Sequence, residues 1–241
     1  MSRLDVYLTE HHMYTSRERA RRAIQEGLVS VNGQAVTKAA FDVSEDDRIQ
    51  AAADPVPFVS RGGLKLEGAF ACYPMDVTGL TCLDVGASTG GFTQVLLERG
   101  AATVTAVDVG HGQLAAALQK DCRVTNLEGT DIRNLSLDLY AKTFDFVSID
   151  VSFISLTHVL PAVYGYMKPG GICVALVKPQ FELGRKALNK KGIVKDKKLL
   201  PKAVETVSDC AEAVGFHIEK SLPSPIRGGD GNTEFLIILT K

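Results

Sequence analysis

The chain has 241 residues, enough for one large domain or for a large and a small one, and its 27 Lys and Arg nearly balance its 28 Asp and Glu. The net charge of −1 excludes a protein basic enough over its whole surface to coat nucleic acid. The five cysteines are odd in number and lack C-x-x-C spacing, which argues against a disulfide framework and a structural zinc site. Free thiols, no apolar signal core at the start and no apolar run near the ~18 residues of a membrane span predict a cytoplasmic protein that binds no metal and no membrane.

The N-terminal 57 residues are expected to form a small α+β domain that begins with two helices. Apolar side chains over residues 4–8 predict a short first helix. Ser16 is a suitable N-cap for a second helix over 17–26, because its hydroxyl can accept from a free N–H of the first turn. Ala20 and Ile24 share one face of that helix, which should pack inward.

A small β element is expected to complete this domain. Residues 29–31 alternate in polarity, and the Asn32-Gly33 pair that follows is a strong signal for a two-residue hairpin turn. Another short strand is expected near residues 48–49. Small residues and prolines over 51–57 predict a linker to the rest of the chain.

Residues 58–241 alternate between strand and helix signals, starting with a helix around 66–73. Predicted strands cover 81–85, 103–107, 144–149, 171–177, 216–218 and 235–239. Predicted helices cover 92–98, 114–118, 156–167 and 199–213. Continuous apolar strands between helices are typical of a sheet buried on both faces. The fold class of this second domain is therefore predicted as α/β, a doubly wound, mostly parallel, Rossmann-like sheet.

The segment 84–92 follows a predicted strand and opens a predicted helix, so its glycines let the backbone approach a ligand closely. Ser88 replaces the middle glycine of a dinucleotide fingerprint, and a carboxylate at Asp84 suits an ammonium such as the amino group of S-adenosylmethionine. Asp108 ends the next strand, where an acid can accept from ribose hydroxyls, and Asp131 is placed to read an adenine amino group. A nicotinamide site and a turn without ligand remain alternatives. The expected cofactor residues are Asp84, Gly86, Ser88, Gly90, Phe92, Asp108, Asp131 and Asp150.

Two predicted strands end in charged groups that should meet at one crevice. Asp150 and Lys178 each follow an apolar strand, and the carboxyl ends of parallel strands form the ligand crevice of open α/β sheets. Desolvation and a second cation, here Lys65, favour the neutral amine that a general base needs. Glu234 opens the last strand and can orient both lysines. Such a grouping suits proton removal from a ribose 2′-hydroxyl during methyl transfer, while strand-end ion pairs and solvated side chains remain the plain alternatives.

The chain also resembles the haemolysin-A-like (TlyA) family of ribosomal RNA 2′-O-methyltransferases over nearly its whole length. The resemblance rests on the segments 60–66, 84–92, 149–155 and 178–182. It implies an N-terminal RNA-binding domain of the αL type found in a small-subunit ribosomal protein, followed by an FtsJ-like methyltransferase domain. It also implies S-adenosylmethionine as cofactor and a cytidine of ribosomal RNA, in an assembled or assembling subunit, as substrate. The family's catalytic tetrad would be Lys65, Asp150, Lys178 and Glu234.

Basic residues gather in two segments. Residues 17–22 hold four arginines against Glu18, and residues 185–202 hold eight Lys or Arg against Asp196 alone. The alternative to RNA contact is a ladder of i,i+4 ion pairs, Glu18–Arg22–Glu26, along the second helix, and the resemblance favours RNA. The segment 185–202 is expected to be a mobile loop that either clamps phosphates or is simply solvated. The candidate RNA-binding residues are Arg3, Arg17, Arg19, Arg21, Arg22 and Arg61.

The leading hypothesis is an S-adenosylmethionine-dependent RNA ribose methyltransferase. Two other classes stay open, a membrane-lysing cytolysin and a non-catalytic RNA-binding protein with an inactive methyltransferase fold. No strongly amphipathic cationic helix supports the first, and the presence of all four tetrad residues argues against the second. Because residues 66–140 carry a net charge of −5, RNA affinity is expected to come from the N-terminal domain and from local basic patches.

Overall fold

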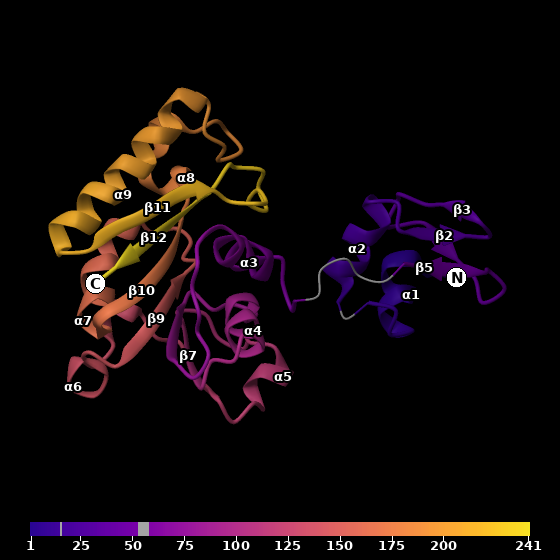
Figure 1. The fold of residues 1–241 in the computed structure, drawn as a ribbon. Helices are drawn as coiled ribbons and strands as arrows, with labels where there is room; N and C mark the ends of the chain where they lie inside the picture. Colours follow the sequence, from indigo (N-terminus) through magenta and orange to yellow (C-terminus); the bar gives the residue numbers. More distant parts are fainter. Residues whose placement is uncertain (15, 53–57) are drawn as a thin grey trace. The chain divides into compact units, whose positions relative to one another are not determined.

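The computed structural model describes residues 1–14, 16–52 and 58–241. The chain divides into two compact units, Met1–Pro57 and Phe58–Lys241 (Figure 1). Among the described residues, no helix is both long and apolar enough to cross a membrane.

Two helices form the core of the N-terminal unit. Helix α1 (Leu4–Glu10) packs against α2 (Arg17–Gln25), and the apolar face of α2 is buried as its spacing predicts. The Ser16 hydroxyl accepts a hydrogen bond from the Arg19 N–H at 3.3 Å, so the predicted N-cap is confirmed. The buried core of this unit consists of Leu4, Leu8, Tyr14, Ala20, Ala23, Ile24, Val29, Val31 and Val43.

Short strands flank these helices. The strands β2 (Val29–Val31), β3 (Gln34–Ala35) and β5 (Ile49–Ala51) form one sheet, and β1 (Ser2–Arg3) pairs with β4 (Asp42–Val43). Asn32 and Gly33 both have positive φ, 53° and 82°, as the predicted two-residue hairpin turn requires. The predicted linker began at Ala51, which is wrong, because Ala51 ends β5 and pairs with Val29. The Ala52 N–H also donates to the Leu28 carbonyl, and residues 53–57 of the predicted linker lie outside the described residues.

A seven-stranded sheet forms the centre of the second unit, in the order β11-β12-β10-β9-β6-β7-β8. Strand β12 runs antiparallel to both its neighbours, and the remaining neighbours are parallel, so the predicted doubly wound, mostly parallel sheet is confirmed. The strands are β6 (Thr81–Val85), β7 (Thr103–Asp108), β8 (Val124–Glu128), β9 (Phe144–Ile149), β10 (Met167–Val177), β11 (His217–Pro223) and β12 (Phe235–Thr240).

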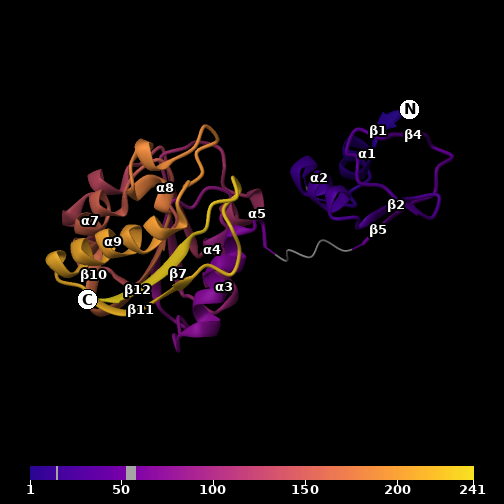
Figure 2. The same cartoon turned by 90° about the horizontal axis from the view of Figure 1, so that it is seen from above.

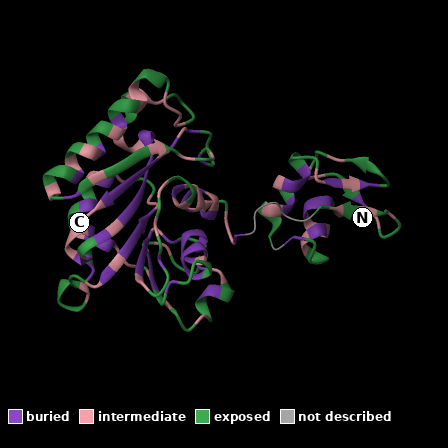
Figure 3. Ribbon diagram, viewed as in Figure 1, coloured by how far each residue is buried: buried purple, intermediate pink, exposed green. Residues whose placement is uncertain are grey.

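Helices cover both faces of this sheet. Figures 1 and 2 show α3 and α4 on one face and α7 and α9 on the other, and Figure 3 shows the central strands as buried. The two edge strands, β8 and β11, are more exposed. The helices are α3 (Gly62–Cys72), α4 (Gly91–Glu98), α5 (Ala116–Gln119), α6 (Leu137–Tyr140), α7 (Leu160–Tyr166), α8 (Pro179–Glu182) and α9 (Leu200–Val214).

Two details differ from the predicted elements. The single helix predicted over 156–167 is a 3-10 turn, Leu156–His158, followed by α7, and Met167 already begins β10. No strand range was predicted over Val124–Glu128, where β8 lies at the edge of the sheet. Its polar and half-exposed residues lack the apolar run of a central strand.

The strand order reverses between β6 and β9, which lie side by side at the centre of the sheet. Successive strands run outward from β6 through β7 and β8 in one direction, and from β9 through β10 in the other. At such a switch point the loops after the two central strands diverge and leave a crevice. The segments that begin at Gly86 and at Asp150 both start at this crevice.

Candidate active site

Four charged side chains meet at the carboxyl edge of the sheet. Lys65 comes from the first turn of α3, Asp150 follows β9 and Lys178 follows β10. Glu234 directly precedes β12. Because β12 is antiparallel to β10, its beginning lies beside the end of β10, which brings Glu234 to the edge where the other strands end.

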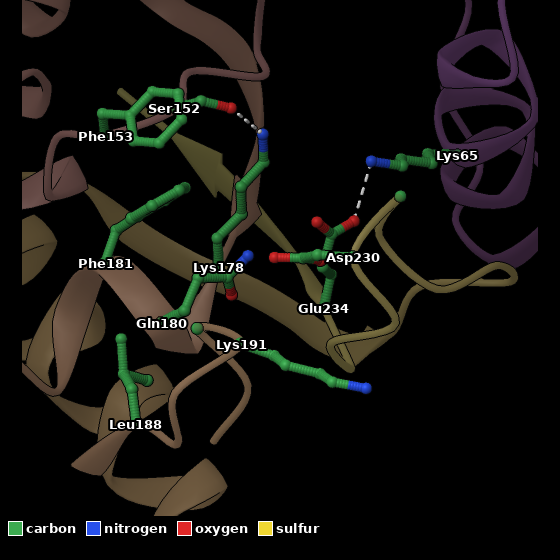
Figure 4. A pocket seen from close by; sticks show the side chains of 12 residues that line it. Lys65, Ser152, Phe153, Lys178, Gln180, Phe181, Leu188, Lys191, Asp230 and Glu234 are labelled. Atoms are coloured by element: carbon green, nitrogen blue, oxygen red, sulfur yellow. Dashed lines mark hydrogen bonds and ion pairs between the residues drawn. The ribbon is translucent and has the colours of Figure 1, made fainter. Parts of the chain in front are cut away.

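The four groups form a chain of alternating charge. The Lys65 Nζ lies 2.7 Å from Glu234 Oε2 (Figure 4). It also lies 3.7 Å from Asp150 Oδ2. The Lys178 Nζ lies 2.7 Å from Asp150 Oδ1 and donates a hydrogen bond to Ser152 Oγ at 2.8 Å. Lys65 and Lys178 are each only 8% exposed, and Glu234 is 3% exposed, so these charges depend on one another for stabilisation. The structure therefore brings all four predicted tetrad residues together.

A cavity of about 440 Å³ opens over this chain of charges. Phe153 stands at the cavity, 91% exposed and with a positive φ of 65°. Its ring lies 5.3 Å from that of Phe181, centroid to centroid (Figure 4). An exposed aromatic ring in a strained backbone conformation is unfavourable by itself and is a common feature of binding sites. The cavity is lined by Lys65, Ser152, Phe153, Lys178, Gln180, Phe181, Leu188, Lys191, Gly192, Gly229, Asp230 and Glu234.

Ser152, Phe153 and Phe181 also belong to the site, although no role was predicted for them from the sequence. The available signal was position, since these residues adjoin Asp150 and Lys178. The orientation of a side chain in a loop has no period that a sequence displays, so their convergence could not be predicted.

Glu182 ties together the two loops that carry Asp150 and Lys178, and it was also missed. Its carboxylate accepts hydrogen bonds from the Ser155 hydroxyl at 2.5 Å and from the Leu156 N–H at 3.0 Å. Burial raises the pKa of the Glu182 carboxyl above its ordinary value. The two loops are thus linked below the cavity as well as through the ion pair of Lys178 with Asp150.

The glycine turn after β6 closes tightly on its surroundings. Gly86 has a φ of 81°, and a Cβ there would lie 2.5 Å from the Asp150 carbonyl oxygen. Gly90 has a φ of 94°, and its Cβ would lie 2.2 Å from Leu118 Cδ1. Ser88 also has a positive φ, 48°, and its N–H donates to Asp108 Oδ2 at 2.8 Å. Glycine is therefore required at two points of this turn.

Asp84, expected at a cofactor ammonium, lies beneath the glycine turn. This side chain is fully buried, and its oxygens accept hydrogen bonds from Thr93 at 2.7 Å and Ser148 at 3.0 Å. The carboxylate thus links β6 to α4 and β9, and its contact with a cofactor ammonium stays a prediction. Phe92, also expected at the cofactor, is 3% exposed and belongs to the buried core.

The two other expected acids remain partly accessible. Asp108 is half-buried and accepts from the Ser88 and Gly110 N–H groups, one on each oxygen, which leaves lone pairs for a ligand. Asp131 is engaged by Arg133, with an ion pair of 2.6 Å. Glu128, which the sequence analysis missed, accepts three backbone N–H groups from the loop 112–114, and these bonds lower its pKa to about 2.

The N-terminal unit contains a second cluster of charge. Asp5 is fully buried, and the guanidinium groups of Arg3, Arg17 and Arg21 bond to it at 3.0, 2.9 and 2.8 Å. Burial by itself raises the pKa of the Asp5 carboxyl, but the three guanidinium groups hold that pKa well below its ordinary range. The arginine side chains are 44–48% exposed, so they face solvent while their acid does not.

Two further candidate RNA-binding arginines, Arg22 and Arg61, lie outside the Asp5 cluster. Arg22 lies 3.9 Å from Glu26, one turn along α2, so part of the predicted ladder of ion pairs is present. Arg61 is exposed in the second unit, and a Cβ at the cavity residue Gly229 would lie 3.4 Å from its guanidinium.

The buried carboxyl of Asp84 has a consequence for stability that can be measured. Burial raises its pKa from 3.8 to about 6, so between these values the unfolded chain is ionised while the folded chain still holds the proton. The unfolded state then binds fewer protons, and stability falls as pH rises. We expect the free energy of unfolding of the wild type, relative to Asp84→Asn, to fall on the order of 1–3 kcal/mol between pH ~4 and ~6. Urea denaturation of both proteins across this range measures it, and a difference independent of pH contradicts it.

Comparison with known proteins agrees with this geometry. A model of FtsJ-like methyltransferases matches residues 58–241, and a model of the S4 domain matches residues 2–49. The 16S/23S rRNA (cytidine-2′-O)-methyltransferase TlyA of Mycobacterium tuberculosis is 41% identical over 239 residues, 99% of this chain and 89% of that protein. A solved structure of a haemolysin-named protein from Streptococcus thermophilus is 41% identical with a TM-score of 0.79, over 100% of this chain and 88% of that one.

The sheet also occurs in more distant proteins. An S-adenosylmethionine-dependent methyltransferase from Mesorhizobium loti is 19% identical and shares the fold with a TM-score of 0.55, over 74% of this chain and 98% of that one. The arrangement of the seven strands, the glycine turn and the full-length relatives lead to one assignment. The chain belongs to the FtsJ-like methyltransferase family and carries an N-terminal S4 domain.

Proposed function

We propose that this protein is a ribosomal RNA methyltransferase that transfers a methyl group from S-adenosylmethionine to the 2′-hydroxyl of a cytidine ribose. The observation that carries the proposal is the buried chain Glu234–Lys65–Asp150–Lys178 at the base of an open cavity. The Mycobacterium tuberculosis relative, whose name states cytidine-2′-O methylation of 16S and 23S rRNA, supplies the expected nucleotide and substrate.

The residues of the glycine turn fit S-adenosylmethionine. Gly86 and Gly90 keep side chains out of the turn, and Asp108 retains lone pairs that can accept from the two ribose hydroxyls of the cofactor. When bound, the cofactor supplies an electrophilic methyl group on a sulfonium. The buried carboxylate of Asp84 holds the turn in shape.

Lys178 is the proposed general base. In this role its Nζ would take up the proton of the 2′-hydroxyl as the ribose oxygen receives the methyl group. Asp150 and Ser152 fix the position of this Nζ, with contacts of 2.7 and 2.8 Å. Lys65, held by Glu234, fixes the other oxygen of Asp150. These contacts hold the four side chains in fixed positions, so they would present a fixed surface to the ribose.

The rings of Phe153 and Phe181 suit a nucleotide base that is no longer stacked within the RNA. Phe153 offers a largely exposed ring in the cavity that Ser152 and Lys178 also line, and it packs against the tilted ring of Phe181 at 5.3 Å between centroids. Base–aromatic stacking contributes about 1–3 kcal/mol and stabilises a nucleotide turned out of an RNA structure. The target nucleotide would then place its base on Phe153 and its ribose against Lys178.

The N-terminal unit is the proposed RNA-binding part. Three half-exposed arginines share one buried acid, so the cluster keeps a net charge of +2 and its guanidinium groups are fixed in advance of binding. Fixed guanidinium groups lose little entropy when they bind phosphate oxygens. Residues 1–57 would find the RNA, and residues 58–241 would perform the chemistry.

Replacing Lys178 tests the proposed chemistry. We expect Lys178→Ala to lower methyl transfer to ribosomal RNA by about 10²–10⁴-fold, because the general base is removed. The assay uses labelled S-adenosylmethionine with isolated ribosomal subunits, followed by mapping of 2′-O-methyl groups. Lys168→Ala is the matched control, since Lys168 belongs to β10, the strand that Lys178 follows, but pairs with Asp145 away from the cavity.

The outcomes separate the competing functions. Label at a cytidine 2′-oxygen that Lys178→Ala abolishes and Lys168→Ala retains supports the proposal. Wild-type activity in Lys178→Ala, or label on a base, contradicts it. Lysis of lipid vesicles by a wild-type protein that transfers no methyl group to RNA would support the cytolysin class instead.

Replacing the arginines of the Asp5 cluster tests the division of labour. We expect Arg17→Gln with Arg21→Gln to weaken RNA binding and to reduce the slope of log K against log salt by about one for each phosphate that the variant no longer neutralises. Binding of S-adenosylhomocysteine, measured by calorimetry, should not change. Arg123→Gln is the control, because Arg123 is an arginine of similar exposure paired with an acid, Asp121, in the other unit. An unchanged salt slope in the double variant contradicts an RNA-binding role for these arginines.

A further inference from the structure

The basic segment after α8 has a defined fold over the cavity. Leu188 and Val194 pair as an antiparallel bridge and close a short hairpin between them. At its tip the Asn189 side chain accepts from the N–H groups of Lys191 and Ile193, at 2.8 and 3.0 Å. Three residues of this hairpin, Leu188, Lys191 and Gly192, line the cavity (Figure 4).

Asn232 fastens this hairpin to the loop before β12. The side chain belongs to a residue that is 2% exposed, and its Oδ1 accepts from the Val194 N–H at 3.1 Å. Its Nδ2 donates to the Gly192 carbonyl at 3.0 Å and to the Asp230 carboxylate at 2.9 Å. Two residues later the same loop carries Glu234. One buried amide therefore fixes the hairpin relative to the tetrad.

Lys191 differs from the other cations of the cavity. The ammonium groups of Lys65 and Lys178 are occupied by Glu234 and Asp150. Among the cavity-lining residues, all of which the structure describes, Lys191 is the cation that has no carboxylate partner. The nearby acid, Asp230, is engaged by the Asn232 amide. An ammonium in this state is available to an anion at the cavity.

We propose that Lys191 binds a backbone phosphate adjacent to the target ribose, and that Asn232 is the positioning residue that holds Lys191 there. The inference rests on the proposed function, because it takes an RNA ribose to lie at Lys178. Every ribose within an RNA strand is flanked by phosphates, and Lys191 lines the same cavity as Lys178, so its ammonium is placed to bind one of them. Phosphate contacts set the register of a strand without reading its sequence, which is what alignment of one 2′-hydroxyl requires.

A pair of neighbouring lysines provides the test. Lys190 precedes Lys191 in the same hairpin and carries the same charge, but it does not line the cavity. We expect Lys191→Gln to raise KM for ribosomal subunits about tenfold with kcat nearly unchanged, as removal of one charge-assisted hydrogen bond predicts. The salt slope of RNA binding should fall by about one. Lys190→Gln should leave KM near the wild-type value.

The test of Asn232 has to distinguish a residue that positions Lys191 from one that only stabilises the fold. In Asn232→Ala the Val194 N–H and the Gly192 carbonyl have no side-chain partner, so the hairpin is released and KM should rise as in Lys191→Gln. Adding Lys191→Gln to Asn232→Ala should then change KM little further, because the two residues act through one contact. Additive effects of the two substitutions would overturn the positioning role.

The outcomes also separate this inference from the proposed function. If the wild type transfers no methyl group to ribosomal RNA, the proposed function fails. If the wild type is active and Lys191→Gln behaves like Lys190→Gln, the phosphate contact alone is refuted. If Asn232→Ala does not fold, the comparison of the two lysine variants still decides the phosphate contact.

Discussion

The ion chain Glu234–Lys65–Asp150–Lys178 is the constraint on which the rest of the second unit depends. Its members come from α3 and from the ends of three different strands, and three of them are at least nine-tenths buried. A buried charge without its partner typically destabilises a protein by about 3–5 kcal/mol. The chain is therefore stable only when the whole sheet has formed. The antiparallel entry of β12 is essential, since a parallel strand would begin at the opposite edge and carry Glu234 away.

The N-terminal unit also depends on a buried charge, but its charges do not balance. In the second unit the charges satisfy one another, and the site is internally close to neutral. Around Asp5, one buried acid serves three arginines and leaves positive charge facing solvent. A neutral site suits chemistry on a single hydroxyl, and an unbalanced cluster suits attraction of a polyanion. The near-zero net charge of the chain thus conceals two opposite local arrangements.

Much of the fold and the tetrad could be predicted from the sequence, because both leave periodic or positional signals. The apolar strands, the Ser16 cap and the Asn32-Gly33 turn are local features, and Lys178 is conspicuous as a cation directly after a buried strand. The burial of Asp84 was not predictable, since an acid before a glycine turn can face either the ligand or the core. Its direction is decided by Thr93 and Ser148, which only the tertiary structure brings to it.

Two residues whose roles were not predicted from the sequence, Asn232 and Glu182, act through contacts between loops. Asn232 acts through a hairpin some 40 residues earlier in the chain, and Glu182 acts through Ser155. The range of strand β8 was not predicted for a different reason, because an edge strand need not be apolar. Loop-to-loop contacts carry no period and obey no local propensity, so a sequence displays the residues but not their pairing.

The charged side chains of the protein cannot select one target nucleotide among others. In the proposed complex, the arginines on Asp5 and Lys191 in the hairpin would contact phosphates, which every nucleotide has, so they would set only affinity and register. The tetrad would contact a ribose, which every nucleotide also has. What remains is the cavity wall near the base, where Phe153 and Phe181 stack without preference and the amide of Gln180 is a buried polar group able to both donate and accept. Discrimination among nucleotides therefore falls to the shape of the RNA that can present a base to this cavity, and to the few polar groups that line it.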